Sequence, residues 1–504
     1  MNNQTIPEGR VYSENNRPQT HFSPPRNWMN DPNGLVHFDG VYHLFYQYNP
    51  ADKVWSDMHW GHATSTDLIQ WTHKPIALFP DPEGLGFVFS GGAVVDWKNS
   101  SGLGTNSSPP LIALFTHSSS SGEQVQSLAY STDQGDSWVM YVGNPIITNP
   151  GIADFRDPKV IWDERNDQWI MVVAAGDRIK FYRSTNLIHW DFLHDFGEET
   201  GAHGGCWECP DLFPLRTKDQ SVQKWVLLVS LNPGGPNGGS ATQYFIGDFD
   251  GHTFNQEHEE TLWIDYGPDH YAGITWDGLS PVSGRRILIA WMGNWDYANH
   301  LPTEPWRGTM TVPRELTLIE TERGMRVAAQ PIAEYKRLSV GQHVAWEDTN
   351  IDRLMVLGQG SSLHDSIDIE IEVELGAMTS SWSLKIGNEY DEQLEIVCSV
   401  ENNKIEVRRD RAAFEVPPEG DFIRAIEAPF HVNGPLIFPL RILKDRSSIE
   451  IFNSEGEALI TALFFTRKPL DRVTIEPAIG GELRVKKAVI NELQSIWNQS
   501  SAEP

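Results

Sequence analysis

Cysteine is scarce in this sequence, which has only three, Cys206, Cys209 and Cys398, among 504 residues. An odd count argues against a disulfide framework and favours a reducing compartment. The first residues lack a basic start followed by an apolar stretch, so they do not read as a secretory signal. We therefore expect a cytoplasmic protein, which would instead be secreted if a native leader had been replaced by an initiating Met.

Positively charged residues are also few. Lys and Arg number 39 against 68 Asp and Glu, and the formal net charge is -29. No basic run could neutralise a phosphate backbone, which argues against nucleic acid and anionic membrane surfaces as partners. No run of about 18 apolar residues exists either, so we expect no segment that spans a membrane.

Long segments with helical periodicity are nearly absent, whereas Trp and Gly are abundant, with 19 and 42 residues. From Val41 onward, short runs of Val, Ile, Tyr, Phe and Trp alternate with clusters of Gly, Pro, Asn and Asp, which is typical of short strands joined by tight turns. The sequence therefore predicts an all-β protein whose aromatic surfaces could stack on sugars. Its length makes two domains the natural expectation.

A phrase that recurs three times indicates a repeated structural unit. In residues 65–71, 131–138 and 184–190, Ser-Thr-Asp or Ser-Thr-Asn leads to a Trp that begins the next predicted strand. Residues of these types form turns because their side chains bond to the nearby backbone. Self-similarity at intervals of several tens of residues is typical of propeller blades, each of which buries its faces against its neighbours.

The pattern changes near Lys336. Residues 367–375 alternate between apolar and acidic side chains, which predicts an antiparallel strand with one exposed face. Residues 447–452, a turn over 453–456 and residues 458–461 predict a hairpin in the same style. We expect a propeller catalytic domain over 1–337 and a β-sandwich over 338–504. The acidic outer face of the sandwich could pack against a second subunit and form a homodimer.

Three short segments offer carboxyl groups for cleaving a glycosidic bond. Retention of configuration needs two carboxyl groups about 5 Å apart, one ionised to attack the anomeric carbon and one protonated to assist the leaving oxygen. Asp31 lies in Trp-Met-Asn-Asp-Pro-Asn-Gly over 28–34, just before a predicted strand. Such residues also dominate ordinary turns. The flanking Trp28 and the aromatic run over 42–48 favour a site over a plain turn.

The other two segments are Phe-Arg-Asp-Pro over 155–158 and Gly-Cys-Trp-Glu-Cys-Pro over 205–210. Asp157 could accept hydrogen bonds from neighbouring sugar hydroxyls, although a surface ion pair before a proline turn is an equal alternative. Glu208 stands between Trp and Cys, and burial near a second carboxylate would keep it protonated as a general acid. The spacing of Cys206 and Cys209 occurs in metal sites, but two further ligands are lacking, so we predict no metal and no cofactor.

Together the three segments resemble the signatures of glycoside hydrolase family 32, the family of invertases, inulinases and levanases. Further resemblances lie at 89–91, 266–272, 291–295, 305–307 and 445–452. The resemblance implies a five-bladed β-propeller followed by a C-terminal β-sandwich. It implies that Asp31 is the nucleophile, Asp157 the transition-state stabiliser and Glu208 the acid/base. It also implies a set of substrate-binding residues: Asn30, Gln47, Trp55, Ser90, Arg156, Cys209, Tyr271 and Trp295.

The same resemblance implies a retaining β-fructofuranosidase whose partner is a small saccharide such as sucrose or a short fructo-oligosaccharide, with fructosyl transfer at high sucrose. Local details at 232–236, 291–295 and 305–307 resemble fungal invertases and exo-inulinases. His270 and residues 273–276 depart from the family pattern, which leaves the acceptor side open.

Five alternatives remain at this stage. An exo-inulinase, a levanase or a fructosyltransferase would use the same chemistry on another substrate or acceptor. A pentose-specific glycosidase on a similar propeller fits the segment over 28–34 poorly. From another class, the chain could be a catalytically silent fructoside-binding protein, since fold alone does not fix function. The presence of all three carboxylates disfavours that reading, because a pure binder needs no proton donor beside a nucleophile.

Overall fold

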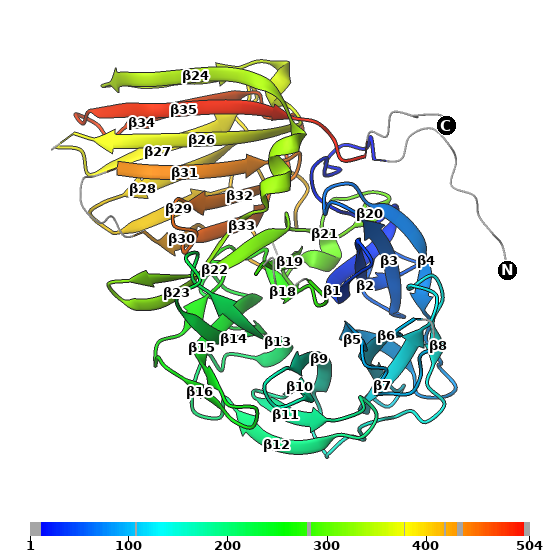
Figure 1. Ribbon diagram of the computed structural model, residues 1–504. Helices are drawn as coiled ribbons and strands as arrows, with labels where there is room; N and C mark the ends of the chain where they lie inside the picture. Colours follow the sequence, from blue (N-terminus) through cyan, green and yellow to red (C-terminus); the bar gives the residue numbers. More distant parts are fainter. Residues whose placement is uncertain are drawn as a thin grey trace.

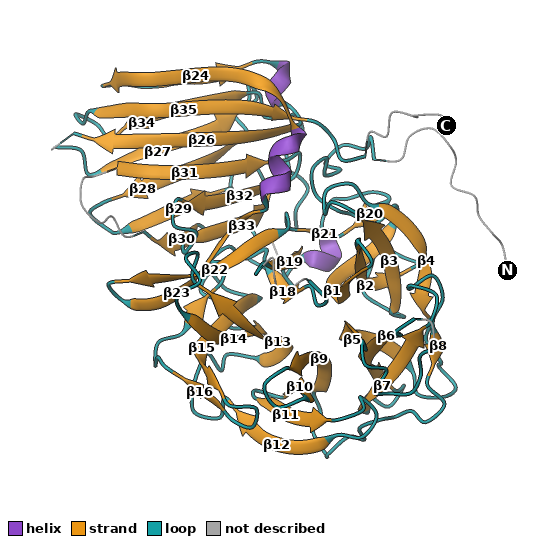
Figure 2. Ribbon diagram, in the orientation of Figure 1, coloured by secondary structure: helices purple, strands orange, loops and turns teal. Residues whose placement is uncertain are grey.

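Strands make up nearly all the regular structure of the chain, as the computed structural model shows (Figure 1). The structure describes residues 12–105, 108–279, 284–376, 378–417, 420–430 and 437–497. Five small sheets surround a common centre, and two larger sheets lie beside them (Figure 2). The fold is therefore a five-bladed β-propeller followed by a β-sandwich, as predicted. Residues 1–11, on which the expectation of no leader rests, lie outside the described residues.

Each blade is a sheet whose first long strand stands nearest the centre of the ring (Figure 1). Blade 1 contains β1 (Asn27–Phe38), β2 (Val41–Asn49), β3 (His59–Ser65), β4 (Thr72–Leu78) and β20 (Trp306–Arg307). Blade 2 contains β5 (Phe87–Val95), β6 (Leu111–Ser118), β7 (Gln124–Ser131) and β8 (Val139–Met140). Blade 3 contains β9 (Phe155–Asp163), β10 (Gln168–Ala175), β11 (Ile179–Ser184) and β12 (Asp191–Phe196).

Blades 4 and 5 complete the ring and lie next to the sandwich (Figure 1). Blade 4 contains β13 (Cys206–Arg216), β14 (Gln223–Asn232), β15 (Ala241–Phe249), β16 (Phe254–Gln256) and β17 (Leu262–Trp263). Blade 5 contains β18 (Tyr271–Thr275), β19 (Arg286–Met292), β21 (Thr309–Met310), β22 (Arg314–Thr321) and β23 (Gly324–Pro331). The short helix η1 (Ala298–His300) lies between β19 and β20.

The ring is closed by a strand from late in the propeller. β20 pairs in parallel with β1, with Asn27 opposite Trp306 and Trp28 opposite Arg307. The backbone N–H of Asn27 also donates to the carbonyl of Pro305 at 2.8 Å. Closing a ring of blades in this way leaves only short, protected sheet edges.

The phrase that recurs in the sequence marks the turn before the outermost strand of blades 1, 2 and 3. In blade 3 the Ser184 Oγ accepts from the N–H groups of Asn186 and Leu187 at 3.0 and 2.9 Å. The Asn186 Oδ1 accepts from Ile188 and His189 at 3.1 and 2.9 Å. Side chains thus satisfy four backbone donors that the turn would otherwise leave unpaired.

The sandwich consists of two six-stranded sheets that begin after the short helix η2 (Ala333–Leu338). One sheet contains β24 (Ser339–Ile351), β35 (Leu483–Leu493), β26 (Ser366–Leu375), β31 (Ile437–Lys444), β32 (Ser448–Asn453) and β33 (Leu459–Leu463). The other contains β25 (Met355–Gln359), β34 (Arg472–Pro477), β27 (Ser381–Gly387), β28 (Gln393–Ser399), β29 (Lys404–Arg408) and β30 (Ile426–Pro429). The short helix η3 (Ser361–Leu363) connects β25 and β26.

Alternation within β26 explains how the two sheets pack. Ile369, Ile371 and Val373 are buried against the facing sheet, whereas Glu370 and Glu372 are partly exposed. Each fully buried side chain of this size contributes about 1.5–3 kcal/mol. The predicted hairpin is also present, because β32 and β33 pair antiparallel. No helix in the described part of the chain is long and apolar enough to cross a membrane.

The seam between propeller and sandwich contains charged groups that are buried. His21 Nδ1 lies 2.7 Å from Asp445 Oδ2, and its Nε2 lies 2.8 Å from Glu450 Oε1. Arg314 from blade 5 pairs with Glu450 and, at 2.8 Å, with Asp265. Because buried charges are tolerated only when they are paired and hydrogen-bonded, this cluster fixes one docking arrangement of the two domains.

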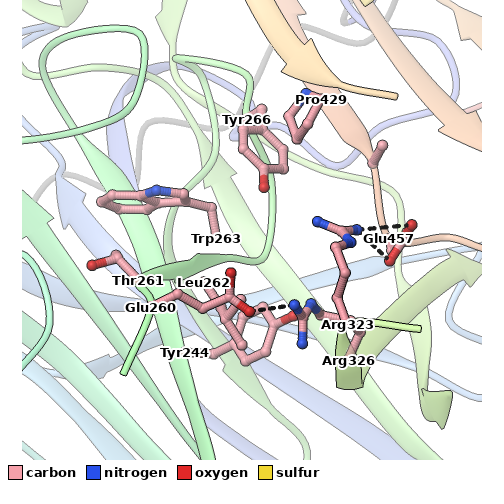
Figure 3. A pocket seen from close by; sticks show the side chains of 11 residues that line it. Tyr244, Glu260, Thr261, Leu262, Trp263, Tyr266, Arg323, Arg326, Pro429 and Glu457 are labelled. Carbon is pink, nitrogen blue, oxygen red and sulfur yellow. Dashed lines mark hydrogen bonds and ion pairs between the residues drawn. The ribbon is translucent and has the colours of Figure 1, made fainter. Parts of the chain in front are cut away.

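A small cavity of about 50 Å³ opens beside this seam (Figure 3). Its walls include Trp263 and Tyr266 from the propeller side and Pro429 from the sandwich. Two ion pairs cross its floor, Arg323 with Glu457 at 3.3 Å and Arg326 with Glu260 (Figure 3). The charged groups are therefore already paired with one another.

Candidate active site

The first strand of every blade is interrupted by a bulge near the centre of the propeller. Register shifts occur in β1 between Met29 and Pro32, and in β5 between Val88 and Gly91. Comparable shifts interrupt β9, β13 and β18. A bulge bends its strand and re-aims a side chain. Residues at these points therefore depart from regular alternation and can face one central cavity.

Three residues at these bulges, none of them glycine, have left-handed backbone. The φ angles are 64° at Asp157, 46° at Cys209 and 53° at Ala272. Such backbone costs of the order of 1–3 kcal/mol and persists only where the surroundings hold it. Here the Cys209 N–H donates to Asp157 Oδ2 at 3.0 Å, and the Ala272 N–H donates to Ser230 Oγ at 3.0 Å. The strained backbone thus places donors where polar side chains need them.

Asp31 is buried, with 9% of its surface exposed. Its Oδ1 accepts from Asn30 Nδ2 at 2.9 Å, and Asn30 is in turn held by Trp28 Nε1 at 2.7 Å. Its Oδ2 accepts from Ser90 Oγ at 2.8 Å and faces the Cys209 Sγ at 3.7 Å. Both carboxyl oxygens are therefore fixed by neighbouring donors.

Glu208 is held by two polar neighbours, Arg156 and Tyr271. Arg156 Nη2 donates to Glu208 Oε1 at 2.7 Å, and Tyr271 donates its hydroxyl to Glu208 Oε2. Arg156 also pairs with Asp154 at 2.5 Å. Although Glu208 stands between Trp and Cys in the sequence, its carboxyl oxygens are held by Arg156 and Tyr271 rather than by apolar neighbours. The bulge after Glu208 interrupts the alternation of β13, so the Cys209 Sγ lies near Asp31 and Asp157.

The pKa of Asp157 depends on the charges of both other carboxyl groups. Burial raises the pKa of Asp157 to about 7; the Arg156 charge opposes this shift, and the charges of Glu208 and Asp31 add to it. Burial raises the pKa of Asp31 to about 6, with a further contribution from Glu208. The three carboxylates therefore repel one another in a poorly solvated space, which is typical of functional sites.

The carboxyl groups open into one cavity of about 420 Å³ at the centre of the propeller. Of the substrate-binding residues proposed from the sequence, six line this cavity: Asn30, Gln47, Trp55, Ser90, Arg156 and Trp295. Gln47 is 2% exposed, and its Nε2 has no hydrogen-bond partner among the described residues. An unpaired buried donor is costly, so a ligand hydroxyl would satisfy it.

Cys209 and Tyr271 occupy different places from those expected. Neither lines the cavity, since they are 4% and 0% exposed and lie behind the carboxyl groups. Burial, followed by the charges of Asp157 and Asp31, holds the pKa of the Cys209 thiol well above its usual range. Cys209 thus remains a donor to the carboxylates, and Tyr271 contacts Glu208 instead of substrate space.

Four further residues line the cavity without having been selected as binding residues from the sequence: Phe89, Ser118, Gln124 and Asn232. Gln124 Oε1 accepts from the Phe155 N–H at 2.9 Å and from Arg156 Nη1 at 3.4 Å. Phe89 precedes Ser90 in a segment that carried the family resemblance, and Asn232 begins a Gly-rich loop. Ser118 and Gln124 stand in no such motif, so the sequence offered no signal for them.

The three cysteines are unbonded, and Cys206 and Cys209 form no disulfide. Among the residues that the structure describes, no group of three or more His, Cys, Asp and Glu side chains could hold a metal ion.

Family models cover both domains. The N-terminal domain model of glycosyl hydrolases family 32 matches residues 21–331, and the C-terminal model matches residues 334–492. The chain belongs to glycoside hydrolase family 32. It is thus a glycoside hydrolase of a fructofuranosidase family, and the resemblance predicted from its three segments is confirmed.

Relatives in this family match this chain across both of its domains. A levanase of Bacillus subtilis is 42% identical over 97% of this chain and 72% of its own length. A solved exo-inulinase of Aspergillus awamori is 32% identical, with a TM-score of 0.89 over 96% of this chain and 100% of its own. A β-fructofuranosidase of Schwanniomyces occidentalis, solved with fructosyl-erythritol, is 28% identical with a TM-score of 0.86 over 97% and 100%. These relatives include a bacterial levanase as well as fungal enzymes, so a specifically fungal character of this chain stays a prediction.

Proposed function

We propose that this chain is a retaining β-fructofuranosidase that removes terminal, non-reducing β-D-fructofuranosyl groups from sucrose and short fructo-oligosaccharides. The observation that carries the proposal is the convergence of Asp31, Asp157 and Glu208 on one cavity with an unpaired donor, Gln47 Nε2. A nucleophile and an acid/base that open into the same space are what double displacement requires.

In the first step, Asp31 attacks the anomeric carbon while Glu208 gives its proton to the departing glycosidic oxygen. The bond from that carbon to the leaving sugar breaks, and a fructosyl ester forms on Asp31. In the second step, Glu208 takes a proton from water, and the resulting hydroxide displaces Asp31 as a carboxylate. Esterification removes the negative charge of Asp31, so this charge no longer acts on Glu208 when Glu208 serves as the base.

Arg156 links substrate binding to the hydrogen bonds made to Glu208. Its guanidinium donates to Glu208 Oε1 at 2.7 Å and to Asp154 at 2.5 Å. Hydroxyls of an arriving sugar would compete for these donors and weaken the ion pair. Binding of a sugar would therefore change the hydrogen bonds made to the Glu208 carboxyl group.

Asp157 supports the sugar rather than attacking it. Its Oδ2 is already held by the Cys209 N–H at 3.0 Å, and its side chain lines the cavity. A carboxylate there can accept from ring hydroxyls and stabilise the positive charge of an oxocarbenium-like transition state. Trp55 and Trp295 offer aromatic faces for the rest of the sugar.

A fructan exohydrolase is the second candidate. The similarity to a levanase and to an exo-inulinase favours longer fructans as substrates. The chemistry is unchanged in that case, because only the group that leaves with the glycosidic oxygen differs. Fructosyl transfer at high sucrose would follow if a second sugar replaced water in the second step.

The test is sugar release from sucrose, inulin and levan by the wild type, by Asp31→Asn and by Asp195→Asn. Asp195 is a surface carboxylate paired with Lys180 at 2.8 Å, so its substitution is a matched control. We expect Asp31→Asn to lower kcat by at least about 10³-fold and the control to retain activity. A wild type that binds fructosides but cleaves none of the three would contradict the proposal and favour a binding protein.

A further inference from the structure

Arg409, in the sandwich, contacts the propeller through a closed triangle of buried polar groups. Its Nη1 donates to Asp269 Oδ2 at 2.7 Å, and its Nη2 donates to the Tyr297 hydroxyl at 3.0 Å. The Tyr297 hydroxyl donates to Asp269 Oδ1 at 2.6 Å. The three residues are at most 3% exposed. The guanidinium also lies over the Phe422 ring, 3.8 Å from its centroid.

The first arm of the triangle leads to the acid/base. Asp269 stands two residues before Tyr271, whose hydroxyl donates to Glu208. The sandwich also holds Asp269 from β33, because the Leu463 N–H donates to Asp269 Oδ2 at 2.8 Å. The position of the Tyr271 hydroxyl is therefore set by a segment that the sandwich anchors.

The second arm leads to the aromatic wall of the cavity. Tyr297 stands two residues after Trp295 and immediately before η1. Asn299, within η1, accepts from the Trp55 N–H at 3.0 Å through its Oδ1. Both tryptophans that line the cavity thus depend on the segment fixed by the Tyr297 hydroxyl.

A second set of hydrogen bonds connects the sandwich to the same cavity wall through the loop that follows β14 in blade 4. Asn237 Nδ2 donates to the carbonyls of Tyr266 and Glu427, and the Glu427 N–H donates back to Asn237 Oδ1 at 2.9 Å. In the same loop, Ser240 Oγ accepts from the Trp295 N–H at 3.1 Å. The sandwich therefore holds Trp295 from two directions.

We propose that Arg409 is a positioning residue for the reaction, and that through Asp269 and Tyr297 the sandwich sets the placement of Glu208 and of the tryptophan wall. A buried guanidinium must keep its partners, because an unpaired charge in this environment is strongly unfavourable. The three side chains of the triangle are therefore held in one arrangement, and this arrangement fixes the positions of residues on both sides of the cavity. The inference rests on the proposed function, since it assigns Glu208 and the wall their roles.

The experiment compares Tyr297→Phe and Arg409→Lys with the wild type for kcat, KM and pH profile on sucrose, fructose affinity and Tm. Tyr297→Phe keeps the ring and removes only the hydroxyl, so it tests the triangle even if Arg409→Lys does not fold. Gln330→Ala is the matched control, because Gln330 Nε2 donates across the same seam to the Asn453 carbonyl at 2.9 Å, away from the cavity residues.

We expect Tyr297→Phe to lower kcat/KM about tenfold, since small misplacements near reacting groups are costly. KM should rise and fructose should bind more weakly, because the tryptophan wall and the Tyr271 contact to Glu208 lose their anchor. In a Tyr271→Phe background the same change should lower kcat/KM by less than tenfold, because that contact is already absent. Gln330→Ala should lower Tm and leave kinetics unchanged.

Wild-type KM, kcat and pH profile in both Tyr297→Phe and Arg409→Lys, with only Tm lowered, would overturn the inference. That result differs from failure of the proposed function, in which the wild type itself would cleave neither sucrose nor fructans.

Discussion

At the scale of single residues, Asp31 shows how the site balances burial against donors. Burial and the Glu208 charge raise its pKa to about 6, while the hydrogen bonds from Asn30 and Ser90 lower it. A nucleophile must be ionised, so those two donors keep Asp31 reactive near neutral pH. Without them the same burial would leave the carboxyl group largely protonated.

The first prediction concerns the acid limb of the pH profile. As pH falls through about 6, Asp31 gains a proton and kcat/KM should fall about tenfold per pH unit. Ser90→Ala removes the 2.8 Å donor to Asp31 Oδ2, so the limb should move to higher pH by about one unit. Ser118→Ala, which also lines the cavity, is the control. An unmoved limb in Ser90→Ala would contradict this account.

At the scale of elements, the five central strands share one structural feature, a β-bulge. Each carries a bulge where its blade reaches the cavity, and three bulge residues accept left-handed backbone. A strand that kept strict alternation would send its side chains into the neighbouring blades instead. The rest of each blade stays regular and supplies the packing that holds these strained points in place.

The turn before the outermost strand gives a second prediction. Asn186→Ala removes the Oδ1 that accepts from the N–H groups of Ile188 and His189. The free energy of unfolding should fall by about 1 kcal/mol, as for other side chains that cap backbone donors, while kcat stays unchanged. Chemical denaturation with parallel activity assays would measure both. A loss of kcat without a loss of stability would count against a purely structural turn.

The sequence indicated regular features of these elements better than irregular ones. The Ser-Thr-Asp phrase and the alternation over 367–375 depend on local chemistry, so blades and sandwich strands could be predicted. The bulges could not, because a bulge is defined by the register of a partner strand. The ion pair between Arg156 and Glu208 joins residues that are 52 positions apart in the sequence. No local sequence pattern indicates such a pair. The three catalytic candidates were suggested by the context of their carboxyl groups, but their roles came only from the resemblance to a family.

At the scale of the whole molecule, the propeller and sandwich meet through buried charges rather than through apolar contacts alone. Burial lowers the pKa of His21, but the hydrogen bonds that its ring donates to Asp445 and Glu450 outweigh burial and raise the pKa to about 9. For Glu450, burial is outweighed by Arg314 and His21, and the pKa falls to about 2. The two domains are thus held together most firmly while His21 is charged and the carboxylates are ionised.

The third prediction follows from these signs. The raised pKa of His21 gives stability that is complete below about 6.5 and is lost as pH rises toward 9. The lowered pKa of Glu450 gives stability that is present above about 4.5 and is lost as pH falls toward 2. Calorimetry should therefore show the highest Tm between these limits.

His21→Asn serves as the comparison for that pH dependence. It should lower stability by about 3 kcal/mol near pH 6, because Asp445 and Glu450 lose a charged partner. It should also flatten the decline of Tm between pH 6.5 and 9. An equally steep decline in wild type and His21→Asn would show that another group titrates there.

The pairing of β20 with β1 determines when during synthesis the active site is completed. Every blade contributes its first strand to the centre, and the ring closes only when a segment near the end of the propeller returns to its beginning. During synthesis, a nascent chain that has emerged only as far as blade 4 has its three carboxylates but no finished cavity around them. We therefore expect fructosidase activity to appear only after β20 has paired with β1.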